Sequence, residues 1–111
     1  KISEIKKIKT NNLNNILKLS KFENQKFDLM SVDVEGHELE VFLGFDFDKY
    51  SPSIIVVEFL DLSLSKIEIK NQNINNIINS KLFKFLTSKN YTLVNFIYAD
   101  LIFVNNNFKK W

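Results

Sequence analysis

Two apolar runs of strand length, separated by a short amphipathic segment, constrain the fold of this chain more than any other feature. The first run lies within residues 27–34, FDLMSVDV, and the second is IIVV at residues 54–57. The second run shows no apolar–polar alternation, which is typical of a central strand covered on both faces. Between the runs, Leu39, Phe42 and Leu43 have the i, i+3, i+4 spacing of a helix. The strand–helix–strand order predicts a parallel crossover unit and hence an α/β fold.

Further helices and strands are predicted before and after this unit in the sequence. They are a helix over about Asn11–Leu19, a helix over about Ile74–Leu86, and two strands over Tyr91–Ile97 and Leu101–Val104. The connection between the two strands is short enough for an antiparallel hairpin. We expect Thr10 to cap the first helix, Asn90 to end the second, and Gly44 to end the helix near Leu43 in a left-handed conformation. A loop is expected over residues 45–50, a loop that could contain a short strand or helix over residues 61–73, and a frayed tail over residues 105–111.

Composition excludes several classes of function. The chain has 111 residues, which is the size of one domain, and it contains no apolar run long enough to span a membrane. The net charge is only +2 and all basic residues are lysines, so arginine cannot read phosphates or bases and we expect no nucleic-acid partner. The absence of cysteine excludes disulfides and thiolate metal sites, and we expect a cytoplasmic protein.

Charged side chains lie at the ends of both apolar runs. Asp33 and Glu35 are two residues apart, so they point to the same side of an extended chain. Glu58 ends the next strand, and His37 supplies a group that titrates near neutral pH. Ligands of open α/β sheets bind at the carboxyl ends of the strands. We therefore expect these four side chains to border one pocket.

Three uses of such a pocket are chemically open. His37 or a carboxylate can act as general base toward a hydroxyl group, and carboxylates can also hydrogen-bond to a sugar, a ribose or an ammonium group. Asp33, Glu35 and Glu58 can hold magnesium, as in a hydrolase or phosphotransferase, although the chain has no P-loop and no arginine for phosphate. We assign no metal ligand. A purely structural interpretation also stands, in which Glu35 and Glu38 only complement the helix dipole.

The segment SVDVEGHELEVFLGFDF, followed by SPSIIVVE, resembles the FkbM family of S-adenosylmethionine-dependent methyltransferases. The closing YTLVNFIYADLIFVNNN resembles the final hairpin of that family, so the resemblance covers roughly Thr10 to Asn106. It implies a class I methyltransferase fold, which is a seven-stranded Rossmann-like sheet whose last strand is antiparallel. It also implies methyl transfer from S-adenosylmethionine, usually to a hydroxyl of a sugar, a glycan or a secondary metabolite.

The resemblance also implies roles for individual residues. Asp33 would lie beside both the donor methyl group and the acceptor, as a catalytic and cofactor-binding residue. His37 would be a second catalytic residue on the acceptor side. Glu35 and Glu58 would bind the acceptor, which is expected to be a small molecule or a glycan.

The chain departs from the family pattern in its glycines. This fold binds the donor mainly through a Gly-rich turn in its first half, whereas the only glycines here are Gly36 and Gly44. We therefore expect residues 1–111 to form one partial domain, with strands four to seven of the Rossmann-like sheet and a C-terminal antiparallel hairpin. Most of the cofactor site would then lie outside this chain, and the open sheet edge could support self-association. The alternative is a non-enzymatic remnant, or a partner-dependent module with half of a Rossmann-like fold.

Overall fold

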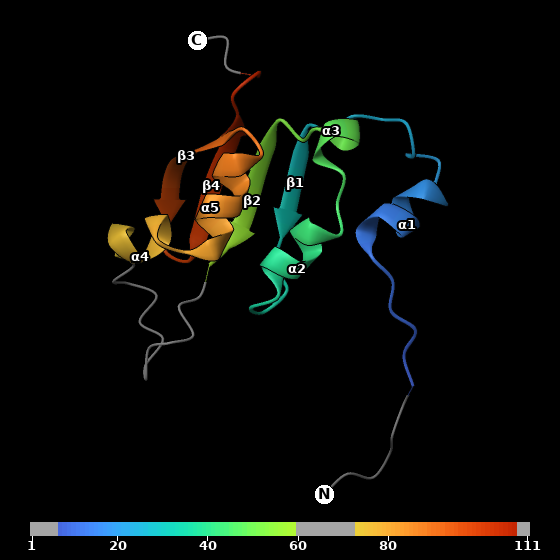
Figure 1. The fold of residues 1–111 in the computed structure, drawn as a ribbon, viewed down its shortest axis with the longest axis horizontal. Coiled ribbons are helices and arrows are strands. Elements are labelled where there is room, and N and C mark those ends of the chain that lie inside the picture. The colour runs from blue at the N-terminus through green and yellow to red at the C-terminus, as the bar shows by residue number, and fades with distance from the viewer. Residues whose placement is uncertain (1–6, 60–72, 109–111) are drawn as a thin grey trace, which may run out of the picture.

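A computed structural model describes residues 7–59 and 73–108, which form a mixed four-stranded sheet with helices packed in front of it (Figure 1). The elements are α1 (Leu13–Lys18), β1 (Leu29–Val32), α2 (Glu38–Leu43), α3 (Phe47–Tyr50), β2 (Ile54–Glu58), α4 (Ile74–Ile78), α5 (Lys81–Ser88), β3 (Tyr91–Ile97) and β4 (Asp100–Asn105). The strand order is β1-β2-β4-β3. Strands β1 and β2 are parallel, and β4 is antiparallel to both of its neighbours. The predicted α/β class, parallel unit and C-terminal hairpin are therefore confirmed.

The core lies between the sheet and the helices in front of it. Ile55 and Val57 of β2 pair in register with Phe103 and Leu101 of β4, and all four side chains are completely buried. They belong to one apolar cluster together with Phe42 of α2 and other helix residues. Burying a side chain of this size stabilises a fold by about 1.5–3 kcal/mol. This row of cross-strand pairs is therefore a main source of the stability of the sheet.

Strand β2 is central, as predicted, but its two faces are not equally covered. Ile55 and Val57 are buried, whereas Ile54 and Val56, which alternate with them along the strand, are only half-buried. The expectation of complete cover on both faces is wrong for the part of the chain that the structure describes. Strand β2 lies between β1 and β4, so neither of its edges is exposed. A central strand can therefore carry a continuous apolar run even though only one of its faces is fully buried.

The start of α1 and the end of α2 meet at a close contact. The side chain of Asn12, and not that of Thr10, caps α1, because its Oδ1 accepts a hydrogen bond from the Asn15 backbone N–H at 2.9 Å. Gly44 has a φ of −95°, so the predicted left-handed conformation is wrong. A Cβ at Gly44 would lie 3.0 Å from the Asn12 Cβ. Glycine is therefore required here for the approach of α1 rather than for a left-handed turn.

The expectation of a loop over residues 45–50 is also wrong, because this segment contains α3. The Asp46 carboxylate caps this helix by accepting hydrogen bonds from the backbone N–H groups of Asp48 and Lys49. Phe47 and Tyr50 are buried, and the Tyr50 ring stacks on Phe27 with 5.3 Å between centroids. Tertiary burial of two aromatic rings thus stabilises a helix of a single turn.

The single helix expected over residues 74–86 consists of two helices, α4 and α5. Ser80 causes the break: its Oγ donates to the Ile77 carbonyl at 2.6 Å and accepts from the Phe83 N–H at 3.1 Å, so it caps α5. Asn90, which follows α5, has a φ of 70°, and its predicted left-handed role after the helix is confirmed.

The end of β4 extends beyond its predicted limit. Asn105, expected at the start of a frayed tail, is the buried last residue of this strand. Its Nδ2 lies 3.4 Å from the Tyr91 hydroxyl, which donates a hydrogen bond to the Pro52 carbonyl at 2.6 Å. Burial raises the pKa of Tyr91 to about 12. The loop expected at residues 61–72 and the last residues, 109–111, lie outside the described residues.

Substitutions of two neighbouring valines of β2, Val56 and Val57, test which face of the sheet packs against the core. Val57→Asp should cost at least about 4 kcal/mol, because it places a carboxylate among completely buried apolar side chains. Val56→Asp, on the half-buried face, should cost about 1–2 kcal/mol. Urea denaturation followed by circular dichroism measures both losses. Equal losses for the two variants would contradict the assignment of the buried face.

Candidate functional site

The carboxyl ends of β1 and β2 bring three predicted site residues together. Asp33 directly follows β1, and Glu58 is the last residue of β2. Because the parallel register pairs Val32 with Val57, Asp33 and Glu58 lie at the same level. One carboxylate oxygen from each of Asp33, Glu35 and Glu58 lies within 4.8 Å of the others. We refer to these three residues as the carboxylate cluster.

The turn that carries Glu35 is held by a fourth acidic residue, Glu38. Glu35 and Gly36 have φ values of 54° and 96°, so the chain turns sharply between β1 and α2. Glu38 is buried at the start of α2, and its Oε1 accepts hydrogen bonds from the backbone N–H groups of Val34 and Gly36, both at 3.2 Å. Glu38 therefore fixes the backbone that presents the cluster.

Sequence reasoning assigned Glu38 only a possible interaction with the helix dipole. The signal that identifies its actual role is its place in the first turn of a helix that follows a glycine turn. A glutamate there can reach back to free backbone N–H groups, as in a capping box. Glu38 is therefore a positioning residue for the site.

Proximity within the cluster changes the protonation of Glu58. A hydrogen bond between the Glu58 and Asp33 carboxyl groups raises the pKa of Glu58 to about 7, with further contributions from desolvation and from the negative charge of Asp33. The charges of Glu35 and Glu38 act in the same direction. Glu58 can therefore hold or release a proton near neutral pH, next to the Asp33 carboxyl group.

The structure places His37 away from the cluster. Its side chain is 77% exposed, and its Nδ1 lies 4.0 Å from Oε1 of Glu40. His37 precedes α2, but its side chain does not cap the helix. It borders a groove between α1 and α2 that Asn12 also lines. Three of the four predicted side chains thus meet, while the catalytic role of His37 stays a prediction.

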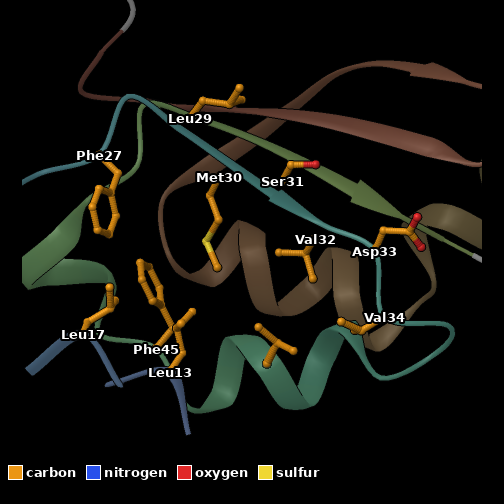
Figure 2. Close-up of a pocket in the computed structure, with 11 residues that line it drawn as sticks. Leu13, Leu17, Phe27, Leu29, Met30, Ser31, Val32, Asp33, Val34 and Phe45 are labelled. Carbon is orange, nitrogen blue, oxygen red and sulfur yellow. The ribbon is translucent and has the colours of Figure 1, made fainter. Parts of the chain in front are cut away.

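An apolar groove of about 500 Å³ runs along the outer side of β1 and reaches Asp33 (Figure 2). It is lined by Leu13 and Leu17 of α1, by the residues of β1, and by Val41 and Phe45 around α2. Strand β1 is an edge of the sheet, and within residues 7–59 and 73–108 it pairs only with β2. The carboxylate cluster therefore lies at one end of an open strand edge.

This arrangement permits a small set of chemical roles. The cluster can accept a proton from a hydroxyl group or hydrogen-bond to a hydroxylated ligand. Three carboxylate oxygens are also a ligand set that a hard divalent cation accepts. Glu58 can take up a proton or hold a cation only after it has released its own proton.

No helix in the described part of the chain is long and apolar enough to cross a membrane.

The raised pKa of Glu58 makes the stability of the chain depend on pH. The pKa of Glu58 rises from an ordinary value of 4.5 to about 7 in the folded state, so the folded chain binds more protons than the unfolded chain between these values. The free energy of unfolding should therefore decrease as the pH rises from 5 to 8. Urea denaturation at both pH values measures this decrease.

Two variants identify the source of the pH dependence. Glu58→Gln should flatten the decrease, because it removes the titrating group. Asp28→Asn, which changes an exposed carboxylate at the other end of β1, should leave the decrease intact. An undiminished decrease in Glu58→Gln would rule out Glu58 as the responsible group.

Comparison with known proteins assigns this chain to a family. The model of the Methyltransferase FkbM domain matches residues 1–91. No curated protein and no solved structure matches the chain. The match includes Asp33, Glu35, His37 and Glu58, and it ends at Tyr91, so most of the β3–β4 hairpin lies outside it. Because the match spans most of the chain, the protein belongs to the FkbM methyltransferase domain family.

Proposed function

We propose that this chain forms the acceptor-facing half of an S-adenosylmethionine-dependent O-methyltransferase. Family membership supports methyl transfer. The observation that carries the proposal is the meeting of the Asp33, Glu35 and Glu58 carboxylates, within 4.8 Å of one another, at the carboxyl ends of two parallel strands. The raised pKa of Glu58, about 7, suits this residue to take the proton of a hydroxyl group as that group reacts.

Each residue of the cluster then has a chemical task. S-adenosylmethionine, when bound, supplies a methyl group on a positively charged sulfur. The acceptor oxygen forms the new C–O bond as the C–S bond breaks, and Asp33 and Glu58 take up the hydroxyl proton. Glu35 accepts a hydrogen bond from a neighbouring group of the acceptor and orients it. Glu38 keeps the turn in place.

The chain fits the acceptor better than the donor. Gly36 lies in the turn before α2 and Gly44 lies at its end, so neither belongs to a Gly-rich loop that could hold the donor. We infer that residues outside this chain supply most of the donor site and that Asp33 contributes to it from the end of the β1 groove. The antiparallel strand β4, last in the chain, supports a partial class I sheet.

Loss of methyl transfer tests the assigned roles. Asp33→Asn and Glu58→Gln should each lower turnover by about 10²-fold or more, because the hydroxyl proton loses its acceptor. Both variants should remain folded, since the cluster lies outside the apolar core. Transfer of a radiolabelled methyl group from S-adenosylmethionine measures turnover, both in this chain and in the natural polypeptide that contains it.

Two comparisons make this experiment decisive. Glu40→Gln, which changes an exposed carboxylate of α2 beside His37 and outside the cluster, should keep full activity. His37→Asn should cost much less than Asp33→Asn, because the exposed imidazole lies beside Glu40. Failure of calorimetry to detect S-adenosylmethionine binding by the natural polypeptide would overturn the proposed function.

A second candidate function rests on the edge of the sheet. Residues 29–32 of β1 carry no charge, no proline and no bulge, and an apolar groove runs beside them. The other edge strand, β3, has a register shift between Leu93 and Asn95, a device that discourages pairing. We infer that a second copy of the chain can pair along β1, as in a module completed by self-association.

Sedimentation velocity tests this pairing. The wild-type chain should form a concentration-dependent dimer, and Leu29→Lys should make it monomeric by placing a charge on the pairing edge. Leu43→Lys is the matched control, since Leu43 and Leu29 are 64% and 60% exposed and Leu43 lies on α2. A wild-type monomer, or a dimer unaffected by Leu29→Lys, would exclude pairing through β1.

A further inference from the structure

Helix α1 lies beyond the β1 edge of the sheet and contributes no buried residue to the fold (Figure 1). Grooves border it on two sides. The β1 groove has a volume of about 500 Å³, and the groove between α1 and α2 has a volume of about 510 Å³. Leu13 of α1 and Val41 of α2 line both grooves. Helix α1 therefore contacts the rest of the fold along a narrow strip between the grooves.

Asn14 joins the start of α1 to the end of α2. Its backbone N–H donates to the Gly44 carbonyl at 2.9 Å, and its Oδ1 accepts from the Asp46 N–H at 2.6 Å. Among the described residues, these are the two hydrogen bonds between α1 and any residue after Ser20. The close approach depends on Gly44, because a Cβ there would lie 3.0 Å from the Asn12 Cβ. We refer to these contacts at the start of α1 as the latch.

The connection that follows α1, residues 19–26, contains no buried residue. Its far end is fixed at Phe27, whose backbone N–H donates to the Tyr50 carbonyl at 2.9 Å and whose ring stacks on Tyr50. Between these ends, Glu23 forms an ion pair with Lys49 at the surface, which is a weak constraint. The connection can therefore act as a hinge about which α1 moves away from the latch.

The face of α1 that borders the β1 groove is apolar. Leu13 and Leu17, one helical turn apart, line this groove together with β1. Figure 2 shows Met30 pointing from β1 into the same groove, toward Phe45. Both leucines and Met30 are only half-buried, so little apolar burial opposes the departure of α1. Because the groove reaches Asp33, α1 forms one wall of a path to the carboxylate cluster.

We propose that α1 is a hinged lid that opens from its latch at Asn14 while the rest of the fold stays intact. Opening exposes the β1 groove and, through it, one side of Asp33. An apolar group that enters the groove covers the half-buried leucines and favours the closed lid. The lid goes beyond the proposed function, because it controls access to the groove for any reaction that Asp33 serves.

A cysteine placed in the groove reports opening, because the chain has no natural cysteine. Met30→Cys should react with N-ethylmaleimide at a rate that hardly changes at low urea concentrations, since opening of one short helix exposes little surface. Val57→Cys, in the core, should react more slowly and with a steep dependence on urea, because its exposure requires global unfolding. Mass spectrometry follows both reactions. Equally steep urea dependence at the two positions would overturn the lid.

Two asparagine substitutions on α1, made in the Met30→Cys background, test the latch. Asn14→Ala should raise the reaction rate about fivefold, as expected from loss of one ordinary hydrogen bond to Asp46. Asn15→Ala is the matched control, because its side chain donates to Asn11 just before the same helix and should leave the rate nearly unchanged. Equal rates in the two variants would contradict an opening at the latch.

A disulfide between Asn12→Cys and Gly44→Cys should hold the lid shut. The two Cβ atoms would lie 3.0 Å apart, and a small shift brings them to the separation of about 3.5–4.5 Å that a disulfide requires. Hydrogen exchange compares the reduced and oxidised forms of this one variant. Reduced α1 should exchange much faster than β4, and oxidation should slow α1 about tenfold or more. Exchange of α1 as slow as that of β4, or no slowing on oxidation, would overturn the lid even if methyl transfer is observed.

Discussion

The parallel register between β1 and β2 is the constraint on which the site depends. It places Val32 beside Val57, so the next residue on β1, Asp33, lies level with Glu58. A slip of one residue would turn the buried side chains of one strand to the opposite face and separate the two carboxyl groups. Val32 of β1 is buried in the core cluster together with its partner Val57, and the loss of its burial opposes such a slip. Core packing thus sets the geometry of a site that lies outside the core.

Mutual repulsion within the cluster is tolerated because two local features offset it. One is the proton that Glu58 retains up to a pKa of about 7, which removes one negative charge at neutral and lower pH. The other is Glu38, whose hydrogen bonds to the Val34 and Gly36 N–H groups stabilise a turn in which Glu35 has a positive φ. A strained turn with like charges is thereby held at the end of a strand, as is common where function requires it.

Asp33 lies where two different surfaces meet. On one side is the apolar groove along β1, bounded by α1 and α2 (Figure 2). On the other side, Glu58 and its register partner Asp100 lead to the turn between β3 and β4. In the proposed reaction the two substrates would approach Asp33 from these opposite sides. Asp33 would then contact both the donor and the acceptor, and Glu58 would contact the acceptor alone.

Local patterns in the sequence determined the strand–helix–strand unit, the C-terminal hairpin and the meeting of Asp33, Glu35 and Glu58. Apolar periodicity reports burial directly, and the ends of parallel strands must share an edge. Ser80 divides the long helix through hydrogen bonds to residues only three positions away, so this break was a local signal that the apolar periodicity concealed. Only the tertiary structure decided that Phe47 and Tyr50 stabilise a helical turn and that His37 borders a groove with α1. The rings of Phe47 and Tyr50 pack on Phe27, Phe85 and Tyr91, which are distant in sequence, and a local pattern carries no information about such contacts.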